Sequence, residues 1–292
     1  MKVLFIYNPH SGKIALKNHI WDILNTFSVA NYDLTVKACN LGVDIAKYVN
    51  DVCADYDLII CSGGDGTLNR VINGIVKKDK IVPVGYIPSG STNDYASSLK
   101  LPKTMEKCAD AITKGQIYKY DIGKFNEDYF IYVAAFGLFS EVSYATDQNV
   151  KNVIGYAAYI VEGIKSLTDV KTYHLKVKSE NEEFEDDFIF GMISNTTSVG
   201  GVYDMSKQDV KLDDGLFEVL LVKKPNSILD LNKLGMYFLG TQESNKYIKH
   251  FKCKEIEIIP DQEMPWSLDG EYGGSPTDVN IKVCYQKIRI VK

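Results

Sequence analysis

Residues 58–70 read LIICSGGDGTLNR, an apolar run followed at once by a glycine-rich turn and then by the start of a helix-like segment. The run Leu58–Cys61 is typical of a buried strand in a parallel sheet, and Thr67–Val76 carries apolar residues at helical spacing. A strand, a tight turn and a helix in this order form part of a βαβ unit. The stretch therefore predicts an α/β domain with a parallel sheet covered by helices.

The same alternation runs through the first 114 residues. Short β-branched or aromatic runs predict strands at Val3–Tyr7, Leu34–Ala38, Leu58–Cys61 and Val84–Ile87. Helical spacing predicts helices at Ile14–Phe27, Asp44–Cys53, Thr67–Val76, Thr92–Leu99 and Thr104–Lys114, the last stopped by Gly115.

After about Asp121 the pattern changes to strand-like runs joined by polar turns, which favours an antiparallel sheet or a β-sandwich. The expected strands are Tyr129–Phe136, Thr172–Lys178, Phe188–Ser194, Leu216–Val222, Lys254–Ile259 and Val279–Cys284. Two helices are expected near Val150–Leu167 and Ile228–Leu239. The acidic run Glu180–Asp187 is most often a solvated hairpin, and we assign it no function.

Charge and composition exclude several classes of protein. The net charge of −5 argues against a nucleic-acid partner. Residues 1–122 hold 14 basic and 12 acidic side chains against 19 and 26 in residues 123–292, which suggests two domains. The longest apolar run, Tyr129–Phe139, has 11 residues, fewer than the roughly 20 that a membrane-spanning helix needs. With no export signal, and with six cysteines that lack zinc-site spacing, we expect a cytoplasmic protein with reduced thiols.

Three glycine-rich turns follow predicted strands, at Asn8–Lys13, Gly63–Thr67 and Pro88–Asp94. In an open α/β sheet, ligands bind outside the carboxyl ends of the strands. Glycines there let backbone amides approach an anion, and a following helix N-terminus adds a favourable dipole, so phosphate is the expected guest. Asp65 would repel phosphate unless a divalent cation lies between them, and Asp94 repeats this arrangement.

Each turn alone is more typical of ordinary turn chemistry, but three at one sheet edge favour a ligand site. Common nucleotide signatures are absent. Gly64-Asp65-Gly66 lacks the third glycine of a dinucleotide fingerprint, and Gly12-Lys13 lacks the upstream glycine of a Walker loop. No GxSxG elbow occurs, and the four histidines show no metal or triad spacing. These absences argue against a Rossmann oxidoreductase and a serine hydrolase.

The stretches NPHSGK at 8–13, GGDGTLN at 63–69 and GSTNDY at 90–95 resemble, in order and spacing, the nucleotide-binding motifs of the diacylglycerol kinase catalytic-domain family. That family includes soluble bacterial diacylglycerol kinases and sphingosine and ceramide kinases. DDGLFE at 213–218 and LDGE at 268–271 extend the resemblance over nearly the whole chain. The resemblance implies ATP-dependent phosphorylation of a lipid hydroxyl in the cleft between two domains.

The resemblance also implies the domains and their sites. Residues 1–122, with a returning segment at about 285–292, would form an ATP-binding α/β domain like those of NAD kinase and phosphofructokinase. Residues 123–284 would form a lipid-substrate β-sandwich. Nucleotide contacts would come from Asn8, Pro9, His10, Ser11, Gly12, Cys39, Gly64, Asp65, Gly66, Thr67, Leu68, Asn69, Arg70 and Ser91.

The implied metal is Mg²⁺, both with ATP and at a second, structural position formed by the Lys211 carbonyl, the Asp214 carboxylate and the Leu216 carbonyl. Carbonyl and carboxylate oxygens suit this hard cation, although a simple turn is the alternative for this segment. Two positions depart from the family: Arg70 replaces an acidic residue, and Glu141 stands where relatives often carry aspartate.

Glu271 matches the proton acceptor of the family. Deprotonating an alcohol needs a carboxylate within hydrogen-bond reach, and Asp269, two residues earlier, would share its face on a strand and assist it. The alternative is a surface turn, because Tyr272-Gly273-Gly274 follows. The apolar Pro265-Trp266 before the motif favours the catalytic interpretation.

A lipid substrate is met at a bilayer, so we expect reversible association with an anionic membrane surface. Lys223–Lys254 contains seven lysines, at 223, 224, 233, 246, 249, 252 and 254, against Asp230 and Glu243, among many apolar residues. This combination favours docking on anionic lipid. A core-packing helix followed by a solvated lysine-rich loop is an equally good interpretation.

The sequence thus predicts a membrane-associating diacylglycerol kinase that makes phosphatidate. Alternatives are a kinase for a sphingoid base, a monoacylglycerol or a polyprenol, or a non-catalytic nucleotide or lipid sensor. Asp65, Asp94 and Glu271 together argue against a sensor. The Asn-Pro-x-Ser-Gly opening and the Asp-Gly-Glu terminus argue against an NAD kinase. The sequence leaves the lipid undetermined and a homodimer open.

Overall fold

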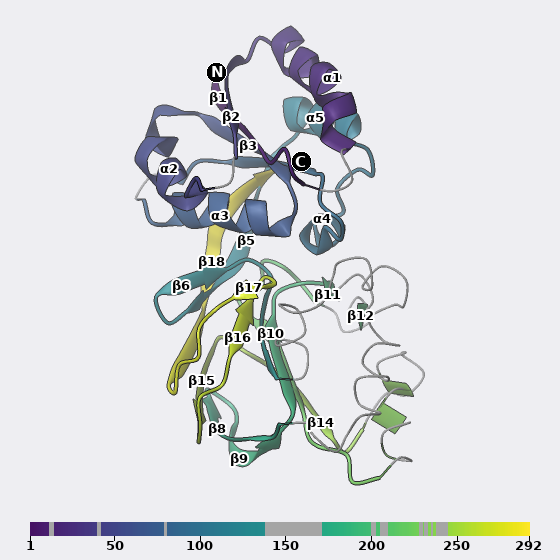
Figure 1. Ribbon diagram of the computed structural model, residues 1–292, viewed down its shortest axis with the longest axis vertical. Helices are drawn as coiled ribbons and strands as arrows, with labels where there is room; N and C mark the ends of the chain where they lie inside the picture. Colours follow the sequence, from purple (N-terminus) through teal and green to yellow (C-terminus); the bar gives the residue numbers. More distant parts are fainter. Residues whose placement is uncertain are drawn as a thin grey trace. The chain divides into compact units, whose positions relative to one another are not determined.

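The computed structural model describes residues 1–11, 15–39, 42–78, 81–137, 171–199, 203–204, 210–227, 230, 233–234, 236–237 and 245–292. The chain divides into two compact units (Figure 1). Unit 1 comprises Met1–Ile122 and Tyr285–Lys292, and unit 2 comprises Gly123–Cys284.

Unit 1 is built on the predicted parallel sheet. Its strands lie in the order β2 (Asp33–Ala38), β1 (Lys2–Tyr7), β3 (Leu58–Gly63), β4 (Val84–Pro88) and the last residues of β18 (Val279–Val291). Tyr7 lies opposite both Ala38 and Ser62, and Gly63 lies opposite Pro88. The carboxyl ends of four strands therefore meet at one edge, where the glycine-rich turns follow.

Helices cover both faces of this sheet (Figure 1). The helices α1 (Ala15–Val29) and α5 (Met105–Lys114) pack on one face, and α2 (Ile45–Val52) and α3 (Asp65–Val76) lie on the other. The core under α1 and α5 includes Phe5, Phe27, Ile60 and Ile112. The short elements η1 (Cys53–Asp55) and α4 (Asp94–Ser98) complete the unit.

Unit 2 is the predicted antiparallel sandwich. One sheet has the order β18, β15 (Glu255–Pro260), β8 (Tyr173–Ser179) and β9 (Glu183–Phe188). The other has the order β14 (Ile248–Cys253), β13 (Phe217–Val222), β10 (Phe190–Ser194), β7 (Val133–Gly137), β16 (Trp266–Leu268) and β17 (Glu271–Tyr272). The remaining strands are β5 (Ile117–Phe125), which pairs with β18 and β6 (Asp128–Phe130), and the pair β11 (Ser198–Val199) and β12 (Tyr203–Asp204).

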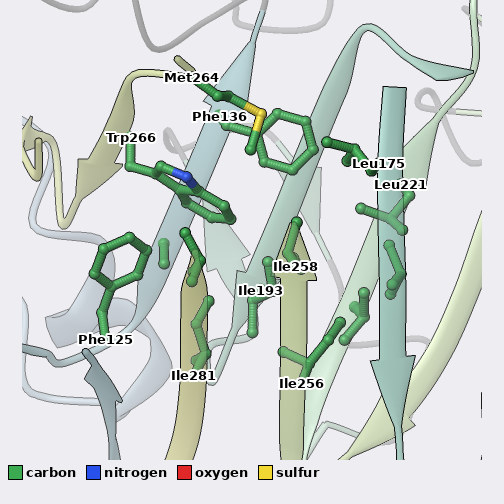
Figure 2. Packing of buried hydrophobic residues seen from close by; sticks show 14 of the residues in the cluster. Phe125, Phe136, Leu175, Ile193, Leu221, Ile256, Ile258, Met264, Trp266 and Ile281 are labelled. Atoms are coloured by element: carbon green, nitrogen blue, oxygen red, sulfur yellow. The ribbon is translucent and has the colours of Figure 1, made fainter. Parts of the chain in front are cut away.

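The core of unit 2 lies between its two sheets. Ile256, Ile258 and Ile281 come from one sheet, and Phe136 and Trp266 come from the other (Figure 2). The Trp266 ring packs edge-on against Phe136, with centroids 4.9 Å apart. Each sheet thus buries one face against the other, as expected for the sandwich that the strand-like runs and polar turns predicted.

Several element boundaries differ from the sequence prediction. The expected strand Tyr129–Phe136 is split into β6 and β7, because residues 131–133 donate their amides to a side chain described below. The strands β5, β9 and β14 were not predicted, since charged residues interrupt their apolar pattern. The helix expected at Val150–Leu167 lies outside the described residues, as does most of the one at Ile228–Leu239.

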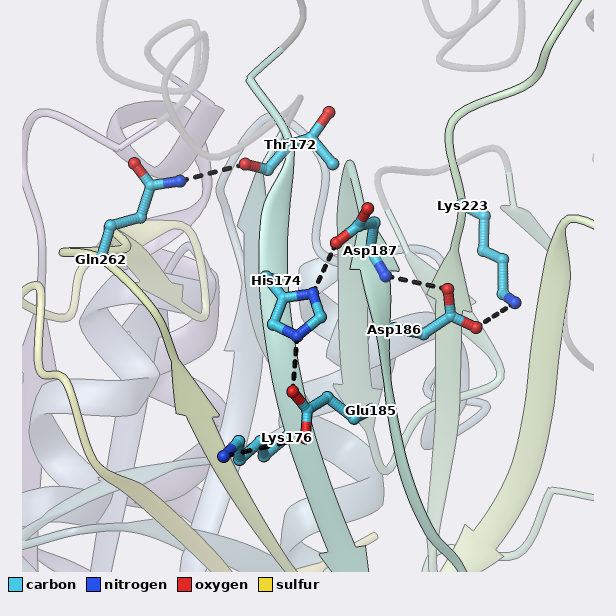
Figure 3. Close-up of polar contacts among 8 residues, drawn as sticks. All are labelled: Thr172, His174, Lys176, Glu185, Asp186, Asp187, Lys223 and Gln262. Atoms are coloured by element: carbon cyan, nitrogen blue, oxygen red, sulfur yellow. Dashed lines mark hydrogen bonds and ion pairs between the residues drawn. The ribbon is translucent and has the colours of Figure 1, made fainter.

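The acidic run Glu180–Asp187 lies in the β8–β9 hairpin, as expected (Figure 3). Three of its carboxylates, those of Glu185, Asp186 and Asp187, are paired with basic side chains. The two ring nitrogens of His174 each lie 2.7 Å from a carboxylate oxygen, one of Asp187 and one of Glu185. Lys223, directly after β13, pairs with Asp186. Hydrogen bonds to Glu185 and then Asp187 raise the pKa of His174 above its ordinary value of 6.5.

The raised pKa predicts a pH-dependent contribution to stability. His174 should stabilise the folded state fully below pH 6.5, and this contribution should disappear as the pH rises through the folded pKa. Denaturant unfolding of the wild type and His174→Gln from pH 5.5 to 8.5 tests this, with exposed His10→Gln as the control. A stability difference between wild type and His174→Gln that does not shrink with rising pH would contradict it.

Candidate functional site

The first glycine-rich turn is joined to the second at the sheet edge. The Asn8 amide N–H donates to the Ser62 carbonyl at 2.9 Å, and Asn8 Nδ2 donates to Thr67 Oγ1 at 3.2 Å. Asn8 Oδ1 accepts from the His10 amide at 2.9 Å, which folds the turn as an Asx turn. Asn8 therefore holds the β1 turn against the start of α3.

The second and third turns touch through their backbones. A Cβ added at Gly90 would lie 2.5 Å from the Gly64 Cα, so only glycine fits there. Asn93 shapes the third turn with a left-handed φ of 55°, accepting from the Gly90 amide at 3.0 Å and donating to its carbonyl at 2.8 Å. The buried hydroxyls of Ser89 and Ser11 lie 3.3 Å apart. The three turns therefore form one continuous surface.

Asp65 has a structural function that the sequence did not reveal. Its carboxylate accepts from the backbone amides of Asp94, at 2.9 Å, and Tyr95, at 3.3 Å. Asp65 thus caps α4 from the neighbouring turn. Asp94 is 4% exposed, so its own carboxyl group is buried at the same place.

The geometry of these turns suits phosphate groups. The helix α3 begins at Asp65, and its N-cap, Gly64, supplies no side-chain cap. The first amides of the helix can therefore serve a bound anion. The hydroxyls of Ser11, Ser89 and Thr67 add neutral donors at the same edge. Both the donors and the glycine contact fit a nucleotide phosphate chain.

The other residues predicted to contact the nucleotide differ in their exposure to solvent. Pro9, His10, Arg70 and Ser91 are exposed, and Gly66 and Asn69 are half-buried. Leu68 is fully buried, so its side chain packs in the core and cannot line a ligand surface. Gly12 lies outside the described residues, as does Glu141, the position where relatives often carry aspartate.

Cys39 lies at the end of β2. Burial raises the pKa of its thiol to about 11, partly opposed by the positive charge of Arg70. The thiol therefore stays neutral at ordinary pH. The effect of Arg70 on this pKa shows that its positive charge lies near the end of β2.

The Asp-Gly-Glu motif forms a tight hairpin. Asp269 and Gly270 have left-handed φ values of 51° and 87°, and Leu268 lies opposite Glu271. This is the geometry of a two-residue type I′ turn. The expectation that Asp269 and Glu271 share one face of a strand is therefore wrong, because Asp269 lies in the turn. Glu271 begins β17 and is exposed rather than partly buried.

Asp269 is 4% exposed and is bound by three backbone amides. Its Oδ2 accepts from Ile131 at 2.6 Å, and its Oδ1 accepts from Tyr132 and Val133, both at 3.0 Å. A fourth hydrogen bond runs from the Asp269 amide to the Val133 carbonyl at 2.8 Å. These contacts fasten the hairpin that carries Glu271 to the β6–β7 connection.

The predicted second metal position is a local turn. Asp214 Oδ1 accepts from the Leu216 amide at 3.1 Å, and Gly215 has a φ of 76°. One carboxylate oxygen is thus used within the turn, while the carboxylate and the Lys211 and Leu216 carbonyls are oxygen donors of the kind that Mg²⁺ prefers. Among the described residues, no group of three or more His, Cys, Asp or Glu side chains could hold a metal ion.

Several lysines of the Lys223–Lys254 stretch are paired within unit 2. Lys252 lies 2.7 Å from buried Glu218, Lys246 lies 3.7 Å from Asp230, and Lys249 lies over the Phe184 ring. The local positive charge available to a membrane is therefore smaller than the sequence count. No described helix is long and apolar enough to cross a membrane.

Two family models match the chain. Residues 2–125 match the diacylglycerol kinase catalytic domain, and residues 133–292 match the YegS C-terminal NAD kinase beta sandwich-like domain. The chain is 31% identical over 271 residues to a diacylglycerol kinase of Bacillus subtilis (strain 168), covering 92% of this chain and 89% of that protein. It is 36% identical over 275 residues to a diacylglycerol kinase of Staphylococcus haemolyticus (strain JCSC1435), covering 92% and 82%.

Solved structures share this fold. A crystal structure of a protein from Bacillus anthracis str. Sterne superposes with a TM-score of 0.85 at 27% identity, covering 99% of this chain and 94% of that one. The crystal structure of a diacylglycerol kinase from the same strain superposes with a TM-score of 0.78 at 24% identity, covering 99% and 96%.

The amide clamp predicts that Asp269→Asn loses stability. An amide group has only one acceptor oxygen, and its NH₂ would face a backbone donor, so we expect a loss of about 1–3 kcal/mol in the free energy of unfolding. Denaturant unfolding measures this. Asp278→Asn, at an exposed position in the same unit, is the control. Equal stability of the two variants would show that the clamp is unimportant.

Proposed function

The chain belongs to the diacylglycerol kinase family of phosphotransferases with an alcohol acceptor, and we propose that it phosphorylates diacylglycerol to phosphatidate with ATP and Mg²⁺. The observation that carries this proposal is the surface made by three turns, where Gly64 touches Gly90. The names of the relatives support diacylglycerol as the substrate. Phosphatidate formation would connect the reaction to phospholipid synthesis.

We propose that unit 1 binds ATP and unit 2 takes the lipid. The amides at the start of α3 and the hydroxyls of Ser11 and Ser89 would hold the phosphates. When bound, Mg²⁺ would neutralise phosphate charge. Asp65, which also holds the start of α4, and buried Asp94 would supply the carboxylates nearest to this cation. Lys211, Asp214 and Leu216 would hold a second, structural Mg²⁺.

Glu271 would act as the general base. Its exposed carboxylate can reach a hydroxyl group and accept its proton as the oxygen attacks phosphorus. Asp269 would contribute indirectly. Its hydrogen bonds to backbone amides hold the hairpin in place, and the hairpin positions the Glu271 carboxylate. Asp269 is therefore a positioning residue in this mechanism, since its oxygens serve the amides of residues 131–133.

We also infer reversible contact with an anionic lipid surface, because diacylglycerol resides in a bilayer. Lys224 is exposed, and Lys246 is also exposed although it lies 3.7 Å from Asp230. Such lysines attract anionic headgroups, each by about 1 kcal/mol near the surface. This contact requires no membrane-spanning helix.

Transfer of radiolabelled phosphate from ATP to a lipid panel tests the proposed reaction. Diacylglycerol should be labelled faster than sphingoid bases, monoacylglycerol or polyprenol. Glu271→Gln should lower turnover roughly 10²-fold or more while ATP affinity stays unchanged, the scale of general base catalysis. Glu263→Gln, at another exposed position of unit 2, is the control. Normal turnover of Glu271→Gln would remove it as the base, and preference for another lipid would reject diacylglycerol.

Co-sedimentation with vesicles tests the membrane contact. The double variant Lys224→Gln, Lys246→Gln should bind phosphatidylserine-containing vesicles at least about ten-fold more weakly, given the contribution expected per lysine. Lys17→Gln, Lys103→Gln removes the same charge from exposed positions of unit 1 and should bind normally. Equal binding of the two double variants would refute docking through this part of unit 2.

A further inference from the structure

Tyr86 lies beneath the point where the second and third glycine turns meet. It is on β4, opposite Cys61 of β3, and only 1% of it is exposed. Its hydroxyl oxygen lies 3.2 Å from the Gly63 carbonyl oxygen and 3.4 Å from Asn93 Oδ1. Gly63 belongs to the second turn and Asn93 to the third, so one hydroxyl group contacts both.

The two acceptors have other donors. The Gly63 carbonyl accepts from the Ser89 amide at 2.8 Å, and Asn93 Oδ1 accepts from the Gly90 amide at 3.0 Å. Removing the Tyr86 hydroxyl would therefore leave neither atom without a hydrogen bond. What it would remove is a buried side-chain bridge between the two turns, which are also joined by the Gly64–Gly90 contact, by the Ser89–Gly63 hydrogen bond and by Asp65. Its expected effect is on the spacing of the turns rather than on stability.

The hydroxyl stays a donor under all ordinary conditions. Burial, and after it the negative charge of Asp65, hold the pKa of Tyr86 well above its usual value of 10.0. Asp65 begins α3 and also caps α4. The Tyr86 hydroxyl therefore lies near the N-termini of both helices.

We propose that Tyr86 is a positioning residue of the nucleotide site, whose hydroxyl sets the spacing of the second and third turns so that both reach the phosphates of ATP. This inference rests on the proposed use of ATP. Tyr86 contacts no substrate, because it is buried beneath the turns. Small displacements of positioning groups are costly in rate and affinity, which is why a buried hydroxyl can matter at a surface site.

The substitution Tyr86→Phe tests the proposal, because it keeps the ring and removes only the hydroxyl. ATP affinity should fall about three- to ten-fold, the effect of losing one hydrogen bond. The KM for ATP should rise by the same factor, while the KM for diacylglycerol and the unfolding midpoint change little. Tyr173→Phe, at a buried tyrosine of unit 2 that is also 1% exposed, is the matched control and should bind ATP normally.

Calorimetric titration of the full chain with ATP, together with steady-state kinetics, distinguishes the outcomes. Wild-type ATP affinity in Tyr86→Phe would overturn the proposal, as would a loss of stability with unchanged affinity. Failure of the proposed function would look different, as an absence of phosphate transfer by the wild type. If Tyr86→Phe does not fold, Asn93→Gly removes the acceptor on the third turn and keeps the left-handed backbone. Because it also removes two hydrogen bonds to Gly90, it should weaken ATP binding at least as much, and wild-type affinity would overturn the proposal.

Discussion

The contact between the backbones of Gly64 and Gly90 is the constraint on which the candidate nucleotide site depends. A Cβ at Gly90 would lie 2.5 Å from the Gly64 Cα, so two turns from neighbouring strands approach more closely than any side chain allows. Around this contact, Asn93 fixes the third turn and Asp65 caps α4. A parallel sheet brings such turns to one edge, and the glycines let them join.

In each unit, an aspartate of a predicted site motif accepts hydrogen bonds from backbone amides and so has a structural function. Asp65 accepts two amides of α4, and Asp269 accepts three amides of residues 131–133. Hydrogen bonds to a carboxylate are stronger than those between neutral groups, so each aspartate rigidifies a turn that carries functional groups. Glu271, by contrast, remains exposed on the hairpin that Asp269 fixes. A preorganised site of this kind suits phosphoryl transfer, in which positioning provides much of the rate enhancement.

The sequence predicted those features that depend on local pattern. Short apolar runs located four strands of the unit 1 sheet, three of them followed by glycine-rich turns, and strand-like runs joined by polar turns located most of the sandwich. Features that depend on contacts between distant segments could not be predicted. The capping of α4 by Asp65 requires two turns to be neighbours, and the left-handed Asp269 places a motif residue in a turn where strand spacing suggested a shared face. In the sequence, Tyr86 is indistinguishable from the other apolar residues of its strand. The contacts of its hydroxyl group are with two different turns and appear only in the fold.

The affinity of Gly90→Ala for ATP, measured by calorimetry, tests the central claim that the joined turns form the phosphate site. Gly74→Ala is the matched control, since its Cβ would lie 2.6 Å from the Ala46 carbonyl oxygen where α2 and α3 pack. Both variants should lose stability through steric overlap. Only Gly90→Ala should lose ATP affinity, by at least about ten-fold, which corresponds to roughly 1.4 kcal/mol. Wild-type affinity in Gly90→Ala, or an equal loss in both variants, would contradict the account.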